Sequence, residues 1–192
     1  MNLIMTSNKI SKKNKALFLD RDGVVNKDYG YVYQINKFHL IDNIKSLIKY
    51  AKENGYKIIV ITNQAGIGRQ LFSVQDYKKI TKYMKDLFLK NNCIIDAVYH
   101  CPYHPSEGIG KYLKDSYDRK PNPGMLLKAQ KDFNLDMNKS ILIGDKMSDI
   151  KAGNSAFVKT NILFNKHKKK YRSEKLLKFF EISSLTEALK YI

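Results

Sequence analysis

The chain has 192 residues, a formal net charge of +17 and two cysteines, Cys93 and Cys101. This length is typical of one domain with a full hydrophobic core and leaves no room for a large second domain. No apolar stretch approaches the length of about 20 residues that a membrane-spanning helix needs, and two cysteines are too few for a disulfide framework. We therefore expect a cytoplasmic protein with free thiols, a flexible N-terminus over residues 1–14 and a single domain over residues 15–192.

The excess of lysine and arginine attracts polyanions and speeds the approach of phosphorylated ligands. Most of these residues are scattered along the chain, and the one true cluster is "NKHKKKYR" at 165–172, within a basic segment over 165–175. We interpret this segment as a solvated surface or tail. Binding of nucleic acid or of an acidic membrane surface is the less favoured alternative.

The chain begins with a strand, helix, strand pattern. Residues 16–20 and 56–63 are apolar runs, the second rich in β-branched residues, and both are typical of buried strands. Between them, apolar residues recur at helical spacing over 44–51, and Gly55 follows as a natural stop. A strand that returns through a helix to another strand indicates a parallel pair.

The pattern then continues. Ser73 with Asp76 three residues later predicts a capping box, and the apolar face from Tyr77 to Phe88 predicts the helix that it opens. A third strand is expected over 94–101. Asn122 and Pro123 suit the cap and first turn of a helix that ends near residue 133. Three further elements follow in order: a strand over 140–145, a short helix from about Met147 and a strand over 159–164.

Alternating strands and helices predict an α/β fold of the Rossmann-like, doubly wound kind, with a mainly parallel sheet and helices on both faces. In such sheets, ligands bind outside the carboxyl ends of the strands. Polar residues gather at those ends in this sequence. They are Asp20 and Asp22 after the first strand, with Arg21 between them, Thr62, Asn63 and Gln64 at the second, Arg119 and Lys120 after the third, and Asp145 at the fourth.

These residue types suit phosphoryl transfer. Asp20, Asp145 and Asp149 offer the hard oxygen ligands that Mg²⁺ prefers. Lys120 and the Thr62 hydroxyl could bind the oxygens of a phosphoryl group. Asp20 could then attack phosphorus in line, while Asp22 protonates the leaving oxygen and later activates water. The alternative is that all of these are ordinary turn and cap residues.

Four motifs together resemble the haloacid dehalogenase-like phosphatases. They are "DRDG" at 20–23, "TNQ" at 62–64, Lys120 in "RKPNPG", and "GDKMSD" at 144–149. The resemblance implies a single phosphatase domain, with Asp20 as nucleophile, Asp22 as acid/base, and Thr62 and Lys120 as phosphate stabilisers. It also implies Mg²⁺ on Asp20, Asp145 and the Asp22 backbone carbonyl, with Asp149 in support.

Within that family, "GYV", "CPYHP" and "RKPNPGM" are similar to the branch of heptose bisphosphate and histidinol-phosphate phosphatases. Such enzymes lack a large cap domain, so loops must select the substrate. The resemblance implies a small phosphorylated sugar as substrate, with removal of the 7-phosphate of D-glycero-D-manno-heptose 1,7-bisphosphate, and no membrane partner. Its expected contacts are Asp28, Tyr29, Gly30, Tyr31, Asn63, Gln64, Ala65, Arg119 and Lys146.

One loop departs from the family. The common form of the family binds a structural Zn²⁺ through a Cys-x-His pair and a Cys-x-Cys pair. At the first pair this chain has Cys101 and Tyr103, and at the second it has Ser116 and Asp118. His104 is adjacent and Asp118 could ligate, but one thiolate with these two does not make a closed site. We expect no zinc, and a loop over 101–118 held by local hydrogen bonds and by packing of three tyrosines. These are Tyr103, Tyr112 and Tyr117.

Other functions are compatible with the same sequence features. A histidinol-phosphate or other small sugar-phosphate phosphatase comes first. A polynucleotide 3′-phosphatase follows, because its domain shares the acid pair and the "TNQ", "GIGR" stretch, and positive charge suits a DNA end. A non-enzymatic nucleic-acid-binding protein is the least favoured. Nucleic acid is therefore not the expected partner, and we expect a monomer.

Overall fold

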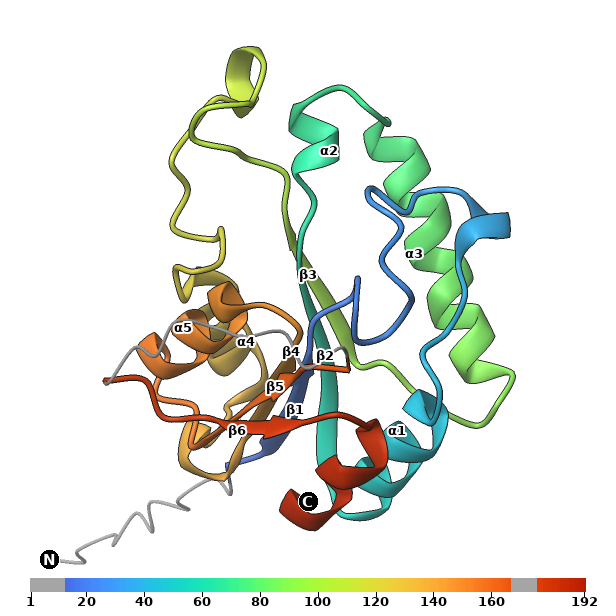
Figure 1. Cartoon of the computed structure of the whole chain (residues 1–192), viewed down its shortest axis with the longest axis vertical. Coiled ribbons are helices and arrows are strands. Elements are labelled where there is room, and N and C mark those ends of the chain that lie inside the picture. The colour runs from blue at the N-terminus through green and yellow to red at the C-terminus, as the bar shows by residue number, and fades with distance from the viewer. Residues whose placement is uncertain (1–12, 167–175) are drawn as a thin grey trace, which may run out of the picture.

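The computed structural model describes residues 13–166 and 176–192, so residues 1–12 of the expected flexible N-terminus and most of the basic segment 165–175 lie outside the described residues. Within the described ranges, no helix is both long and apolar enough to cross a membrane. Among the described residues, the connections between strands consist of loops and helices, and no cap domain is evident (Figure 1).

One six-stranded sheet forms the centre of the molecule, in the order β3-β2-β1-β4-β5-β6. All five neighbouring pairs are parallel, which confirms the expected fold class. Strand β1, in the middle of the order, therefore has β2 on one side and β4 on the other. The strands are β1 (Lys15–Leu19), β2 (Tyr56–Asn63), β3 (Ala97–Cys101), β4 (Ile141–Gly144), β5 (Thr160–Phe164) and β6 (Phe180–Ile182).

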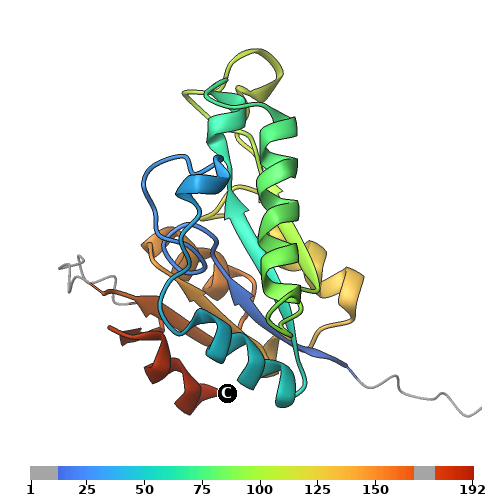
Figure 2. The same ribbon diagram turned by 90° about the vertical axis from the view of Figure 1, so that its right-hand side faces the viewer.

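Helices cover both faces of this sheet (Figures 1 and 2). The α-helices are α1 (Ile44–Glu53), α2 (Ala65–Gly68), α3 (Val74–Leu89), α4 (Gly124–Phe133) and α5 (Met147–Ser155). The 3₁₀ helices are η1 (Ile35–Lys37), η2 (Gly110–Tyr112), η3 (Met137–Lys139) and η4 (Leu185–Tyr191). One face packs against α1, α3 and η4, and the other against α4 and α5.

The alternation of side chains along β1 explains these two layers. Leu17 and Leu19 belong to the core that α1 and α3 cover, whereas Ala16 and Phe18 belong to the core beneath α4 and α5. All four are fully buried. A parallel sheet covered on both faces needs such a continuous apolar strand, and each buried leucine or phenylalanine stabilises the fold by about 1.5–3 kcal/mol.

The predicted helix start at Ser73 is confirmed. The Asp76 amide donates to Ser73 Oγ at 3.1 Å, and the Ser73 amide donates to the Asp76 carboxylate at 3.0 Å. This reciprocal pair satisfies two amides that the first turn of α3 leaves without a partner.

The expected start of the third strand is wrong by three residues, since β3 begins at Ala97 rather than at residue 94. The Asp96 carboxylate accepts a hydrogen bond from the Ile58 amide at 2.7 Å and pairs with Lys52 at 3.0 Å. A side chain therefore takes the place of a strand carbonyl opposite β2. Ile94 is half exposed, so its apolar character did not indicate a buried strand.

The predicted start of the fourth helix is also shifted. Pro123 is the N-cap of α4 and Gly124 is its first residue, whereas the sequence suggested Asn122 as the cap. The Asn122 side chain instead donates to the Ser116 carbonyl at 3.2 Å, which binds the helix start to the preceding loop.

The sequence analysis did not predict β6 or η4. In the case of β6, three strand residues are too few to show a period.

Candidate active site

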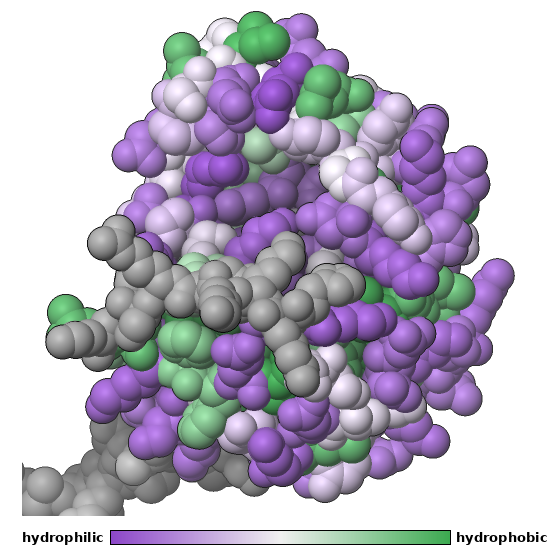
Figure 3. Space-filling model, viewed as in Figure 1, coloured by the Kyte–Doolittle hydropathy of each residue, from purple (hydrophilic) through white to green (hydrophobic). Residues whose placement is uncertain are grey.

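The carboxyl ends of three adjacent strands bring the predicted catalytic residues together. Leu19 of β1 pairs with Val60 of β2 and Ile143 of β4, so Asp20 emerges between these neighbours. The Asp20 amide still donates to the Ile143 carbonyl at 3.0 Å, which holds this residue against β4. Hydrophilic residues surround a hollow on this part of the surface (Figure 3).

A cavity of about 250 Å³ occupies this edge, and most of the predicted site residues line it. Three do not. Tyr29 and Asp145 line a neighbouring cavity of about 460 Å³, and Asp149 is buried at 1% exposure. Ser148 lines the first cavity and was not predicted, although its place in "GDKMSD", just after the fourth strand, could have indicated it.

Three carboxylates form a cluster beside the cavity. Asp20, Asp145 and Asp149 each place a carboxylate oxygen within 4.8 Å of the others. The loop after β1 can approach this cluster because Gly23 has no side chain: a Cβ there would lie 2.3 Å from an Asp145 oxygen, and its φ of +100° is itself unfavourable for other residues.

Burial and mutual repulsion shape the electrostatics of this cluster. Burial, then the charge of Asp20, raises the pKa of Asp145 from 3.8 to about 8. Burial also raises the pKa of Asp20, against the opposing effect of Lys120. Crowded carboxylates with raised pKa values are stabilised by a divalent cation, and oxygen ligands fit Mg²⁺. The residues present therefore fit the metal that the sequence suggested.

Lys120 neutralises part of this charge. Its ammonium lies 2.8 Å from Asp20 and 2.5 Å from Asp149, and it donates to the Ile61 carbonyl at 3.0 Å. Burial alone would lower the pKa of Lys120, but Asp149 and Asp20 hold it above its ordinary value. Asn63 fixes the backbone of Lys120 with two hydrogen bonds, one to its amide and one to its carbonyl.

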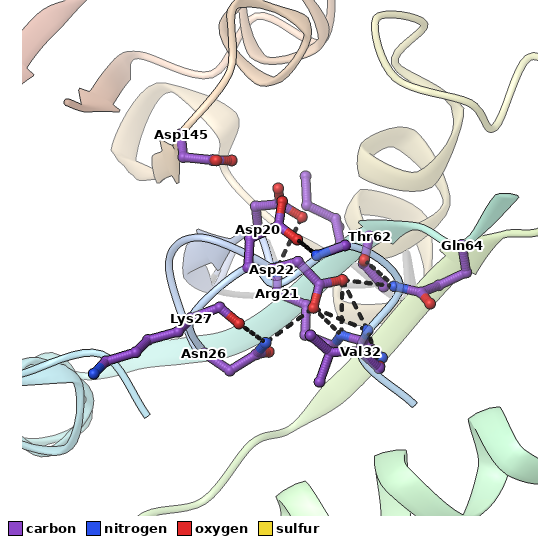
Figure 4. A network of polar contacts seen from close by, with 12 residues as sticks. Asp20, Arg21, Asp22, Asn26, Lys27, Val32, Thr62, Gln64 and Asp145 are labelled. Carbon is purple, nitrogen blue, oxygen red and sulfur yellow. Dashed lines mark hydrogen bonds and ion pairs between the residues drawn. The ribbon is translucent and has the colours of Figure 1, made fainter. Parts of the chain in front are cut away.

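Asp22 is engaged by a different set of donors. Its carboxylate accepts from Arg21 at 2.8 Å, Asn26 at 2.9 Å and Gln64 at 3.0 Å. Figure 4 shows this carboxylate directed toward Asn26 and Gln64, while Asp145 lies beyond Asp20 on the opposite side. A metal contact from Asp22 would therefore come from its backbone carbonyl, as the sequence resemblance implied.

Gln64 links two of the predicted catalytic residues. Its side-chain amide donates to Thr62 Oγ1 at 2.8 Å as well as to Asp22. Gln64 is only 3% exposed, so this expected substrate contact also supports the Thr62 hydroxyl from inside the protein.

The loop after β1 carries the other expected substrate contacts. Asp28 accepts from the Gly30 amide at 2.9 Å and pairs with Lys146 at 3.1 Å. Although partial burial opposes them, these two donors hold the pKa of Asp28 below its ordinary value. Tyr31 accepts a hydrogen bond from Arg69, which also pairs with Glu107 at 3.2 Å. Arg69 therefore joins two loops at the rim.

Comparison with known proteins assigns the family. A protein from Burkholderia mallei named D-glycero-alpha-D-manno-heptose-1,7-bisphosphate 7-phosphatase is 54% identical over 79% of this chain and 80% of its own length. The beta-named counterpart from Haemophilus influenzae is 45% identical over 78% of this chain and 81% of its own. The chain belongs to the heptose bisphosphate phosphatase branch of the haloacid dehalogenase-like phosphatases.

Two further comparisons give a matching family model and a shared fold. A family model described as polynucleotide kinase 3 phosphatase matches residues 5–181. A crystal structure of D,D-heptose 1.7-bisphosphate phosphatase from B. bronchiseptica, complexed with magnesium and phosphate, superposes with a TM-score of 0.77. It is 24% identical and covers 92% of this chain and 96% of that one, which establishes the shared fold.

Local contacts hold the loop over 101–118, the loop in which the sequence departs from the zinc pattern of the heptose bisphosphate phosphatases. Two hydrogen bonds to His104 Nδ1 come from the Ser106 and Glu107 amides, at 3.3 and 3.0 Å, and Asp118 pairs with Lys128. Tyr103 and Tyr112 pack with ring centroids 6.0 Å apart. The expected packing of Tyr117 is wrong, since it is 62% exposed.

The same loop ends at Arg119. Its guanidinium donates to the Tyr103 carbonyl at 3.3 Å and reaches the cavity. Cys101 and Ser116, at two of the positions that the resemblance assigned to zinc ligands, are buried beside each other, and burial raises the pKa of the Cys101 thiol. Side-chain and backbone contacts thus place Arg119 at the rim.

Proposed function

We propose that this protein removes the 7-phosphate of D-glycero-D-manno-heptose 1,7-bisphosphate in an Mg²⁺-dependent reaction. The placement of Asp20 gives the strongest support for this proposal. Its carboxylate stands at the end of the central strand, inside a cluster of three acids, with the Lys120 ammonium 2.8 Å away. The names and identities of the relatives supply the substrate.

The chemistry follows from these residues. Asp20 attacks phosphorus in line, the bond to the sugar oxygen breaks, and Asp22 gives that oxygen a proton. Water then attacks the aspartyl-phosphate, with Asp22 taking its proton, and Asp20 is regenerated. Lys120 and Thr62 bind the phosphoryl oxygens. Mg²⁺ held by Asp20, Asp145 and the Asp22 carbonyl, with Asp149 in support, would neutralise their charge.

Residues at the rim of the cavity would select the substrate. We propose that Arg119 and Lys146 contact the phosphate that is not cleaved, and that the loop over 28–31 contacts the sugar. Asn63, Gln64 and Ala65 border the same cavity. The higher identity to the alpha-named relative favours the alpha anomer. A phosphorylated intracellular sugar suits the cytoplasmic, monomeric protein that the sequence suggested.

A second candidate is hydrolysis of a polynucleotide 3′-phosphate. The description of the matching family model and the net charge of +17 favour it. Binding of a DNA end releases many counterions, so this activity would fall steeply as salt is raised from 50 to 200 mM. A small sugar bisphosphate would show a much weaker dependence.

The test is phosphate release from a panel of substrates, with and without Mg²⁺. The panel holds both anomers of heptose bisphosphate, histidinol phosphate, fructose bisphosphate and a 3′-phosphorylated oligonucleotide. We expect the highest kcat/KM with a heptose bisphosphate and no turnover in EDTA. Preference for the oligonucleotide, with a steep salt dependence, would replace the proposed substrate. Full turnover in EDTA would remove the metal from the mechanism.

A further inference from the structure

Arg21 stands between the two leading aspartates, and its side chain is buried. Only 1% of it is exposed, which is rare for a guanidinium because removing a cation from water costs several kcal/mol unless it is paired. Nothing in the proposed chemistry uses this residue. Its burial within one residue of both Asp20 and Asp22 therefore calls for a function.

The Arg21 side chain folds back onto Asp22. Its Nε lies 3.1 Å from each carboxylate oxygen, and one terminal nitrogen lies 2.9 and 2.8 Å from the same two atoms. Such a two-nitrogen fork fixes the plane of the carboxylate as well as its distance. The same terminal nitrogen donates to the Val32 carbonyl at 2.7 Å, in the loop that holds Tyr31.

Two other buried donors complete the arrangement. Asn26 donates to one oxygen of Asp22 and Gln64 to the other, so each oxygen has a side-chain donor in addition to Arg21 (Figure 4). Lys120, by contrast, contacts Asp20 and Asp149. The two leading aspartates thus pair with different cations, Asp22 with Arg21 and Asp20 with Lys120.

We propose that Arg21 is the positioning residue for Asp22: it sets the orientation of this carboxylate and connects it to the Val32 carbonyl, next to the loop over 28–31. The inference rests on the proposed role of Asp22 as acid/base. A carboxylate that is 16% exposed and held by three side chains cannot reorient without breaking contacts with Arg21. Arg21 does not line the cavity, whereas Asp22 does, so Arg21 would act on proton transfer through Asp22.

The competing explanation is that Arg21 only stabilises the fold. A double-mutant cycle separates the two. Arg21→Met and Arg21→Lys are each made alone and in combination with Asp22→Asn. For every variant that folds, kcat and KM are measured with heptose bisphosphate and Mg²⁺, and the melting temperature is determined. Lys52→Met serves as a control, because it breaks an ion pair with Asp96 at the opposite end of β2.

We expect Arg21→Met to lower kcat by about 10- to 100-fold, the range that loss of a charge-assisted hydrogen bond gives, with KM changed less than about threefold. Arg21→Lys keeps the charge without the fork and should recover part of that loss. In the Asp22→Asn background, the same substitutions should lower kcat no further. Lys52→Met should have a lower melting temperature and an unchanged kcat.

An equal loss of kcat in both backgrounds would overturn the inference, because the effect would then not pass through Asp22. So would full activity of Arg21→Met. If Arg21→Met does not fold, the cycle with Arg21→Lys gives the same decision. An active Asp22→Asn protein would instead overturn the acid/base assignment in the proposed function, and with it this role for Arg21.

Discussion

The Lys120 ammonium lies 2.8 Å from the Asp20 carboxylate, and both side chains are less than one tenth exposed. This pair joins residues 100 positions apart, one directly after the central strand β1 and the other in the loop before α4. Asp149 shares the same ammonium at 2.5 Å. One cation therefore compensates two buried acids, and its removal should affect both stability and catalysis.

The first prediction concerns this cation. Lys120→Met leaves Asp20 and Asp149 buried without their partner, which typically costs about 3–5 kcal/mol. We expect a melting temperature lower by about 2–4 °C for each kcal/mol lost, and activity reduced at least about 100-fold. Asp20→Asn is the control: it should be equally inactive but should lose less stability, because Lys120 keeps Asp149. An active Lys120→Met protein would contradict its role.

The second prediction links magnesium to pH. Burial, together with the charge of Asp20, raises the pKa of Asp145 in the folded protein from 3.8 to about 8. Between these values the folded state binds the extra proton, so this group lowers the free energy of unfolding as pH rises. Mg²⁺ must displace that proton at pH 6 but not at pH 9.

Thermal unfolding with Mg²⁺ and with EDTA at pH 6 and pH 9 measures this linkage. The gain in melting temperature from Mg²⁺ should be larger at pH 9, and proton release on binding should be larger at pH 6. In Asp145→Asn, the gain in melting temperature from Mg²⁺ should be small at both pH 6 and pH 9. A gain that is independent of pH in the unsubstituted protein would show that Asp145 is already ionised at pH 6.

The third prediction concerns the phosphate that is not cleaved. Arg119 reaches the cavity while its guanidinium also donates to the Tyr103 carbonyl. Arg119→Ala should lower kcat/KM for heptose bisphosphate about 10- to 100-fold more than for a sugar monophosphate, because a charge-assisted contact is worth about 1.5–3 kcal/mol. Equal losses on both substrates would place Arg119 away from the second phosphate. Arg119→Lys should recover part of the difference.

The fourth prediction is that the purified protein contains no stoichiometric zinc. His104 and Asp118 already have partners in the Ser106 and Glu107 amides and in Lys128, and a structural zinc site needs four ligands. Elemental analysis of protein purified without added metal measures this directly. About one zinc per chain, lost together with thermal stability in Cys101→Ser, would show that His104 and Asp118 have rebuilt the site.

Local sequence patterns were enough to predict most of the architecture. The apolar runs at 16–20 and 56–63 became β1 and β2, and the capping box at Ser73 opens α3 as expected. These features depend on residues within a few positions of one another, so a period or a cap is visible in the sequence. The misplaced start of β3 came from a contact across 38 residues, between Asp96 and Ile58.

Strand ends and motif spacing are local properties, so the residue types at the carboxyl ends of the strands could be predicted without a structure. How these side chains face one another depends on contacts between distant parts of the chain. Parallel pairing of β1 with β4 brings Asp20 to Asp145, and the direction of each side chain depends on partners that packing supplies. Arg21 shows the difference: its position between two aspartates is plain in the sequence, but its choice of Asp22 and Val32 comes from burial, which forces a cation to pair with the acceptors in reach.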